Sequence, residues 1–406
     1  MSEARRSLEL TAARTPGPGA AMLQRLLCRL ERGRLSVVLP DGAAVMHRGA
    51  LPGQEAQLEL RSWKPLRALL LGGGNGFSEC YIAGDWSSPD LAAFLRFCAE
   101  NMAALKTEAG STRGAGLIAR LRHWCNRNSR AGSRRNILAH YDLGNSFYAR
   151  WLDASMTYSS ALYTAQEEDL ADAQMRKLAR IAELLQAGPG ADILEIGCGW
   201  GALAEQLASC GARVTGLTLS PAQVQYARAR LAAAGLEERA EIVLRDYRDE
   251  NGVYDHIVSI EMLEAVGEAW WPSYFAALRA RLKPGGRAVL QVITIDEGCF
   301  DDYRRHPDFI QLHVFPGGML PTKSAIAAQA ARAGLMLTGT EFFGQSYALT
   351  LAEWRRRFLR AWPEIEREDR FAPQFKRLWE YYLAYCEAGF VTGMTDVGLY
   401  VLERTP

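Results

Sequence analysis

The sequence predicts a doubly wound, Rossmann-like α/β fold, preceded by a small N-terminal α+β domain. The first observation is a glycine-rich turn, Gly197-Cys-Gly-Trp-Gly201, which follows a short apolar strand from Ile193 and precedes a helix that begins near Ala202. The second is the regular alternation that follows, with expected strands and helices at 212–219, 222–233, 240–244, 254–260, 271–282 and 287–294. Alternation of this kind specifies a parallel sheet with right-handed crossovers.

The 406 residues are enough for more than one domain. Residues 1–20, rich in Gly, Pro, Ala and Arg, are expected to form a flexible tail. Residues 21–105 are predicted to form a small α+β domain with a helix from Met22, a hairpin at 35–46, a strand at 57–61 and a helix near 91–105. The glycines at 72–76 are expected to interrupt the apolar segment that precedes them. Residues 106–135 are expected to be a basic linker, and 136–406 the main domain, with an antiparallel last strand at 396–402.

Composition excludes several classes of protein. The net charge of +1 argues against a general electrostatic attraction to nucleic acid. No apolar run is long enough to cross a membrane, and no N-terminal segment has the hydrophobic core of an export signal. The eight cysteines are scattered without zinc-ligand spacing. These observations favour a reduced, cytoplasmic protein without a structural metal.

The basic linker has two interpretations. Arginines recur between Arg113 and Arg135, and Leu117, Ile118, Leu121 and Trp124 are interleaved with them. A basic segment with apolar and Trp side chains can lie on an anionic membrane surface. A solvated linker explains the same composition equally well.

The glycine loop predicts a nucleotide-type ligand, although a glycine-rich turn that binds nothing has the same pattern. Glycines allow a sharp turn and a close approach of the ligand to backbone N–H groups, and the next helix directs its N-terminus at the ligand. A dinucleotide site requires an acidic residue about 20 positions downstream. The second strand ends instead in Leu217-Thr-Leu-Ser220. This disfavours NAD and leaves Thr218 and Gln223 as neutral hydrogen-bonding candidates.

Several motifs in a fixed order resemble those of the cyclopropane-fatty-acyl-phospholipid synthase family, to which the mycolic acid cyclopropane synthases also belong. They are the aromatic-rich segment His140–Ala161, the loop Ile193–Gly201, the strand end Gly216–Gln223 and the segment Val314–Pro321. The resemblance covers about residues 77–405. It implies a methyltransferase that uses S-adenosylmethionine (SAM), with an unsaturated phospholipid in a bilayer as substrate and a peripheral position on the inner face of the membrane. A homodimer is left open.

The resemblance also implies roles for individual residues. Tyr158 and Ser159 match positions that contact the methionine part of SAM, and Gly197, Gly199 and Gly201 match the cofactor loop. Thr218, Leu219 and Gln223 match contacts on the ribose side, and Asp246 and Tyr247 match contacts to adenine. Glu264 and Tyr347 match an active-site glutamate and tyrosine. A helix-start carboxylate and a packed aromatic are the structural alternatives for these two.

The implied chemistry requires a dry site and a base. Methylation of a cis alkene leaves a carbocation, which water would trap and aromatic faces can stabilise. Loss of a proton then gives a cyclopropane, a methylene branch or a shifted alkene, and reduction gives a methyl branch. In the family a bicarbonate ion serves as base, held by Glu, His, Tyr and a backbone group at a Cys position.

This sequence departs from that pattern at three positions. Ser160 replaces the Cys, Ala265 replaces the His that follows the glutamate, and Gln291 replaces the His in the strand segment Leu290–Ile293. Glutamine can hydrogen-bond bicarbonate but cannot carry positive charge. Glu261 is an additional carboxylate, interpreted as a surface charge in preference to a substitute base. Cyclopropanation, with bicarbonate held by Glu264 and Tyr347 and by Ser160 and Ile293 nearby, is expected ahead of a methylene- or methyl-branched product.

Three other functions remain as alternatives. One is a methyltransferase of another small molecule. A nucleic-acid methyltransferase is disfavoured because no Asn-Pro-Pro-Tyr or Asp-Pro-Pro-Tyr loop follows the fourth strand. A lipid carrier with a degenerate fold is disfavoured because the glycine loop is intact.

Overall fold

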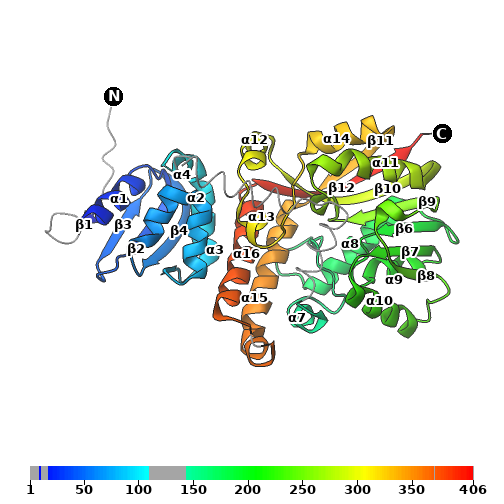
Figure 1. The fold of residues 1–406 in the computed structure, drawn as a ribbon, viewed down its shortest axis with the longest axis horizontal. Helices are drawn as coiled ribbons and strands as arrows, with labels where there is room; N and C mark the ends of the chain where they lie inside the picture. Colours follow the sequence, from blue (N-terminus) through cyan, green and yellow to red (C-terminus); the bar gives the residue numbers. More distant parts are fainter. Residues whose placement is uncertain (1–8, 11–16, 109–142, 370, 406) are drawn as a thin grey trace. The chain divides into compact units, whose positions relative to one another are not determined.

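A computed structural model describes residues 9–10, 17–108, 143–369 and 371–405 (Figure 1). The chain divides into two compact units. The first comprises Met1–Arg122, His306–Phe309 and Trp362–Thr392, and the second comprises the remaining segments. From residue 109 onward, the expected basic linker lies outside the described residues, and so do His140, Tyr141 and Asp142.

The first unit contains a five-stranded sheet in the order β1-β3-β2-β4-β5. The expected hairpin is confirmed, because β2 and β3 pair antiparallel with Val37 opposite Val45. The inward-facing residues of β2 alternate with outward-facing ones, as in a sheet with one covered face. The elements of its N-terminal part are β1 (Glu9–Leu10), α1 (Pro18–Leu27), β2 (Arg32–Val38), β3 (Ala44–Arg48), β4 (Leu51–Leu60), α2 (Lys64–Ile82), β5 (Trp86–Ser87), α3 (Leu91–Glu100) and α4 (Met102–Glu108).

The glycine run at 72–76 interrupts the apolar segment before it, as expected. Gly73, within the bounds of α2, leaves the helical region at φ 61° and ψ −150°, so two helical segments meet there at a kink. Glycine adopts such a conformation without steric cost.

Helix α16 (Pro373–Val391) belongs to the first unit, although it follows the main domain in sequence. Arg377 donates hydrogen bonds to the carbonyl groups of Tyr81 and Trp86, and its guanidinium lies over the Tyr81 ring. Tyr381 packs against Trp86 and Tyr81. The unit boundaries therefore differ from a single domain over 136–406, because packing of distant segments outweighs their order along the chain.

The second unit is built on a seven-stranded sheet in the order β11-β12-β10-β9-β6-β7-β8. Strands β8, β7, β6, β9 and β10 are parallel, and β12 runs antiparallel to β10, as expected from the sequence. Strand β11 was not expected. The strands are β6 (Asp192–Ile196), β7 (Arg213–Thr218), β8 (Ala240–Leu244), β9 (Tyr254–Ile260), β10 (Leu282–Ile295), β11 (Leu335–Phe342) and β12 (Thr395–Arg404).

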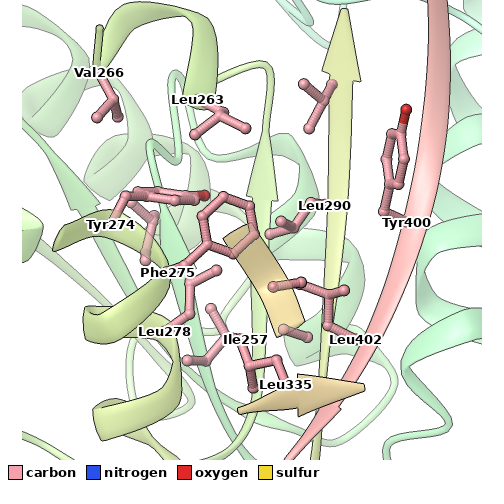
Figure 2. Packing of buried hydrophobic residues seen from close by; sticks show 14 of the residues in the cluster. Ile257, Leu263, Val266, Tyr274, Phe275, Leu278, Leu290, Leu335, Tyr400 and Leu402 are labelled. Atoms are coloured by element: carbon pink, nitrogen blue, oxygen red, sulfur yellow. The ribbon is translucent and has the colours of Figure 1, made fainter. Parts of the chain in front are cut away.

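Two apolar cores cover the two faces of this sheet. Neighbouring residues of one strand face opposite cores, as Val289 and Leu290 do on β10. Figure 2 shows Tyr274, Phe275 and Leu278 of α11 over one face, directed toward Leu290 and its neighbours. Helices α8, α9 and α10 cover the other face. Because both faces are buried, the central strands are apolar throughout rather than alternating.

Two helices of the second unit begin at side-chain caps of the expected kind. Asp169 caps α8 through the backbone N–H of Ala171, and Ser220 with Pro221 begins α10. No helix among the described residues is long and apolar enough to cross a membrane. The remaining helices are α7 (Asn145–Ala149), α8 (Leu170–Leu185), α9 (Ala202–Ser209), α10 (Pro221–Ala233), α11 (Trp271–Arg281), α12 (Glu297–Arg305), α13 (Phe309–His313), α14 (Lys323–Arg332) and α15 (Gly344–Asp369), with short 3₁₀ turns at Tyr247–Asp249, Leu263–Ala265 and Glu268–Trp270.

Candidate active site

The candidate residues gather at the carboxyl ends of the parallel strands, where open α/β sheets bind ligands. The glycine loop follows β6, Thr218 ends β7, and Glu261 follows β9. Gln291 lies on β10 opposite Ile260, the last residue of β9. Tyr347 comes from the first turn of α15.

The glycine loop has the geometry of a cofactor cradle. Gly197, Gly199 and Gly201 all have positive φ, which L side chains rarely adopt. A Cβ at Gly197 would lie 2.7 Å from the Met262 side chain, and one at Gly201 would lie 2.8 Å from Ala227. At Gly199, by contrast, an added Cβ would meet no heavy atom within 4 Å. The loop backbone is therefore open at Gly199, which fits the close approach of a cofactor such as SAM.

The predicted ribose-side residues form a buried polar pair beside this loop. The Thr218 hydroxyl donates to Gln223 Oε1 over 2.7 Å and accepts from the Ser220 N–H. Both side chains are buried. Leu219 lies between Thr218 and the cap of α10. This arrangement offers neutral donors and acceptors of the kind that bind ribose hydroxyls.

The predicted adenine-side residues, Asp246 and Tyr247, make contacts within the chain. Asp246 caps the backbone N–H of Arg248 and forms an ion pair with its guanidinium. The Tyr247 ring packs edge-on against Tyr274 in the core, and burial raises the pKa of its hydroxyl to about 12.

Glu261 is the centre of the predicted catalytic group, which contradicts its interpretation as a surface charge. Among the described residues, three donors reach its carboxylate. The Ser160 N–H and Gln291 Nε2 donate to Oε1 over 2.9 and 2.7 Å, and the Tyr347 hydroxyl donates to Oε2 over 2.7 Å. Burial raises the pKa of Glu261, and these donors together with the nearby Lys177 ammonium partly offset the effect.

The backbone of Glu261 is as unusual as its side chain. It has φ 49°, in the left-handed region that favours glycine, and its N–H donates to the Gln291 carbonyl over 2.8 Å. A residue other than glycine in this region costs of order 1–3 kcal/mol, and such strain is concentrated at functional sites. The strained backbone turns the side chain from the end of β9 toward Ser160 and Tyr347.

Glu264 does not join this carboxylate cluster. One of its oxygens accepts a hydrogen bond from the Ile293 N–H, and among the described residues the other oxygen has no hydrogen-bond partner. Burial, together with the negative charge of Glu261, raises the pKa of Glu264 to about 8. Glu264 and Tyr347 were expected to hold a bicarbonate ion together, but in this structure the Tyr347 hydroxyl donates to Glu261. Ala265, in the same 3₁₀ turn, adds no polar group.

Lys177 and Gln174 of α8 hold the segment that contains Ser159 and Ser160. Lys177 Nζ donates to the Ser159 hydroxyl over 2.7 Å, and Gln174 Nε2 donates to the Ser159 carbonyl over 2.8 Å. Burial lowers the pKa of Lys177 to about 8. Neither residue was predicted from the sequence. The available signal was their position on the apolar face of α8, between Ala173 and Leu178.

An aromatic cluster lies next to the carboxylate. The Tyr158 ring packs within 5.6 Å of the rings of Tyr148, Trp151 and Trp354. The Trp354 ring also lies 6.1 Å from that of Tyr347, edge to face. Aromatic faces carry negative quadrupole potential and exclude water. The cluster therefore suits a cationic group or intermediate.

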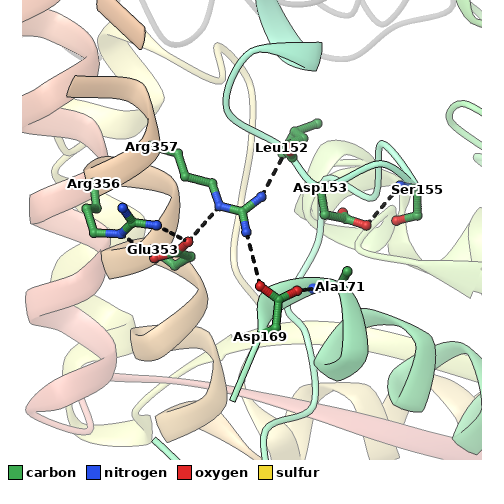
Figure 3. Close-up of polar contacts among 8 residues, drawn as sticks. All are labelled: Leu152, Asp153, Ser155, Asp169, Ala171, Glu353, Arg356 and Arg357. Atoms are coloured by element: carbon green, nitrogen blue, oxygen red, sulfur yellow. Dashed lines mark hydrogen bonds and ion pairs between the residues drawn. The ribbon is translucent and has the colours of Figure 1, made fainter. Parts of the chain in front are cut away.

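Hydrogen bonds join helix α15 to the loop that contains Ser160. The Ala161 N–H donates to Thr350 Oγ1 over 3.1 Å, and the Tyr163 N–H donates to Ser346 Oγ over 3.1 Å. Figure 3 shows Arg357 reaching from α15, where it binds Glu353, to the Leu152 carbonyl and Asp169. These contacts fix the position of Tyr347 relative to Ser160.

Comparison with known proteins supports a family assignment. Residues 128–399 match the mycolic acid cyclopropane synthetase family. The tuberculostearic acid methyltransferase UfaA1 of Mycobacterium tuberculosis is 38% identical, over 95% of this chain and 91% of its own length. The cyclopropane-fatty-acyl-phospholipid synthase of Escherichia coli K12 is 36% identical, over 88% and 89%.

Solved structures agree with this assignment. The cyclopropane synthase MmaA2 from Mycobacterium tuberculosis has a TM-score of 0.62 and 29% identity, and the match covers 66% of this chain and 98% of MmaA2. The mycolic acid cyclopropane synthase CmaA1, complexed with SAH and CTAB, has a TM-score of 0.60 and 28% identity, over 66% and 98%. The chain therefore belongs to the mycolic acid cyclopropane synthetase family of SAM-dependent methyltransferases.

Proposed function

We propose that this enzyme methylates the cis double bond of an unsaturated acyl chain carried by a phospholipid, and that it releases a methylene-branched chain. The observation that carries the proposal is the carboxylate cluster of Glu261, Ser160, Gln291 and Tyr347 beside an aromatic wall. A site for an alkene-derived cation needs both a water-excluding aromatic surface and a base.

The residues have separate tasks in this reaction. SAM, held at the glycine loop and at Thr218 and Gln223, supplies an electrophilic methyl group. The rings of Tyr158 and Trp354 face the positive charge that methyl addition leaves on the acyl chain. The carboxylate cluster then receives a proton from the methylated substrate.

The departures at Ser160 and Gln291 favour the branched product. In the arrangement that the resemblance implies, a histidine and a glutamate hold a bicarbonate ion. Here the Gln291 amide donates a hydrogen bond to Glu261, and Glu264 accepts one from the Ile293 N–H. If proton removal is slower than in the bicarbonate arrangement, the cation has time for a 1,2-hydride shift from the methylated carbon. Loss of a proton from the new methyl group then yields a methylene branch with no oxidant or reductant.

Cyclopropanation is the second candidate, and the relatives named as cyclopropane synthases favour it. The two products are isomers, so mass alone does not separate them. The test is incubation with SAM and vesicles of a monounsaturated phospholipid, followed by NMR of the released fatty acids. Vinylidene protons are expected. Cyclopropane ring protons alone would assign the second function, and no added carbon would overturn both.

We also propose that the substrate is taken from the membrane surface. The E. coli relative is named for a phospholipid substrate, and the arginine-rich segment around Arg120 has the composition of a surface-binding element. Replacement of Arg120, Arg122 and Arg127 by Gln should weaken sedimentation with anionic vesicles, at about 1 kcal/mol per charge. Unchanged sedimentation would leave this segment as a plain linker.

A further inference from the structure

We propose that Glu261 is the catalytic base and that its carboxylate occupies the place of the bicarbonate ion, so that the enzyme needs no bicarbonate. This inference rests on the proposed function, because it identifies the group that receives the proton. The geometry points to it in three independent ways.

The first observation is the identity of the donors. The resemblance implies a bicarbonate held by Glu264 and by three donors, which are the backbone at position 160, the residue at position 291 and Tyr347. In this structure the same three groups bind the carboxylate of Glu261, over 2.7–2.9 Å. A carboxylate and a bicarbonate present the same pair of anionic oxygens to such donors. The two anions would therefore compete for one place.

The second observation is that the side chain of Gln291 is complementary to the carboxylate of Glu261. Its Nε2 faces two acceptors, Glu261 Oε1 at 2.7 Å and the Ser160 carbonyl at 3.4 Å, so the amide orientation follows from the chemistry. A protonated histidine at this position would instead form a charge-assisted bond to an anion. Glutamine suits a carboxylate that is covalently attached, because no extra charge is needed to retain it.

The third observation is the backbone of position 261. A glycine would adopt φ 49° without strain, whereas glutamate adopts it at a cost. The Glu261 N–H bond to the Gln291 carbonyl maintains this conformation and directs the side chain into the cluster. Because Oε2 accepts one hydrogen bond from Tyr347, it retains a lone pair for a proton.

The step balances without another reactant. After the hydride shift, a C–H bond of the new methyl group breaks, and its electron pair forms the C=C bond of the methylene group. The proton passes to Glu261 Oε2 and then to solvent. Without the hydride shift, the electron pair of that C–H bond closes a cyclopropane ring onto the original cationic carbon, and the same carboxylate receives the proton, so the inference does not depend on which product forms.

Chemical rescue tests the inference. Glu261→Gly removes the carboxylate and suits the local backbone, leaving an anion-sized space among the Ser160 N–H, Gln291 and Tyr347. In CO₂-free buffer this variant should lose at least about 10²-fold in turnover on monounsaturated phospholipid vesicles, the usual contribution of a general base. Added bicarbonate should restore much of that loss. Glu261→Gln should lose as much without rescue, since its amide fills the space. The exposed control Glu241→Gln should resemble the parent.

Two further readouts separate this inference from the proposed function. Isothermal titration should give the same SAM affinity in the parent and in both Glu261 variants. ¹³C-labelled bicarbonate should show binding to Glu261→Gly by NMR and none to the parent, whatever the substrate or product. Stimulation of the parent by bicarbonate, or more than half of the parental turnover in Glu261→Gln, would overturn the inference. If the parent transfers no methyl group to lipid while only the Glu261→Gly variant binds bicarbonate, the proposed function fails and the anion site remains.

Discussion

At the scale of single residues, two neighbouring glutamates have opposite environments. Glu261 has three donors, whereas Glu264 is buried with one oxygen unpaired among the described residues. The pKa of Glu264 is raised to about 8, first by burial and second by the charge of Glu261. A protonated Glu264 places no second negative charge beside the proposed base, which favours the ionised form of Glu261.

This raised pKa predicts the direction of a pH effect on stability. The folded state holds the Glu264 proton more tightly than the unfolded chain does. Its stabilisation is therefore complete below the ordinary pKa of a glutamate, 4.5, and is lost as pH rises through about 8. Glu264→Gln should flatten the decline in unfolding free energy between about pH 4.5 and pH 8, at up to about 1.4 kcal/mol per pH unit. Urea unfolding across this range measures the slope. Identical slopes in parent and variant would show that Glu264 does not titrate with folding.

The pKa shift of Lys177 changes stability with pH in the opposite direction, so its effect can be separated from that of Glu264. Its pKa is lowered to about 8, so the unfolded chain binds more protons between pH 8 and 10.5 and stability should rise with pH there. Its contribution lies above the window in which Glu264 acts.

The glycine loop supports a prediction about the cofactor. Gly199→Val places a branched side chain where the structure has open space at φ 53°. The variant should lose SAM binding at least tenfold, because valine both resists this φ and fills the approach to the loop backbone. Isothermal titration measures the affinity, and Gly188→Ala, outside the left-handed region and with no close neighbour, is the control. Parental affinity in Gly199→Val would exclude this loop as the cofactor site.

In the proposed mechanism Gln291 determines how firmly a free anion is held, so it supports a prediction about product. Glu261→Gly combined with Gln291→His recreates the histidine that the resemblance implies. With bicarbonate present, the double variant should give a larger cyclopropane fraction than Glu261→Gly alone, because a charge-assisted bond is roughly twice as strong as a neutral one. NMR of the lipid products measures the ratio. An unchanged ratio would show that residue 291 does not control the fate of the cation.

At the scale of elements, the sequence predicts what depends on local patterns. Apolar runs and caps located β6, β8, β9 and α10 closely, because burial on both faces and a Ser-Pro start leave clear signals. Strand β11 was missed because its exposed residues alternate at the sheet edge and its pairing with β12 is antiparallel and nonlocal. The role of Glu261 was also missed. Its partners lie 101, 30 and 86 residues away in sequence, and only the folded sheet brings them together.

Helix α15 supports a prediction about positioning. Thr350 is fully buried and accepts the Ala161 N–H, next to Ser160. Thr350→Val keeps the shape but leaves this N–H unpaired, at a cost of about 1–3 kcal/mol in unfolding free energy. Turnover should fall as well, because the Ser160 N–H is no longer fixed toward Glu261. Urea unfolding and lipid methylation measure the two effects. The exposed Thr340→Val on β11 is the control, and equal behaviour of both variants would contradict this role.

At the scale of the whole molecule, the chain exceeds the matched mycolic acid cyclopropane synthases by an N-terminal part, because the family match begins at residue 128. The MmaA2 match covers nearly all of MmaA2 but only two thirds of this chain, whereas the UfaA1 and E. coli relatives extend over most of it. The first unit combines N-terminal residues with α16, which follows the candidate catalytic residues in sequence. We therefore expect folding of this unit to require segments from both sides of those residues.

Trp86 is the best probe of that requirement. It is fully buried, donates from Nε1 to the Phe77 carbonyl, and packs against Tyr81, Phe94 and Tyr381. Trp86→Ala should destabilise the first unit by about 3–5 kcal/mol, because it removes a large side chain and leaves a cavity. Calorimetry should show a lower first transition, while SAM affinity, measured below that transition, stays parental because the cofactor residues belong to the second unit. The exposed Leu71→Ala on α2 is the matched control and should change neither quantity appreciably. A parallel fall in SAM affinity would show instead that the two units fold as one cooperative structure.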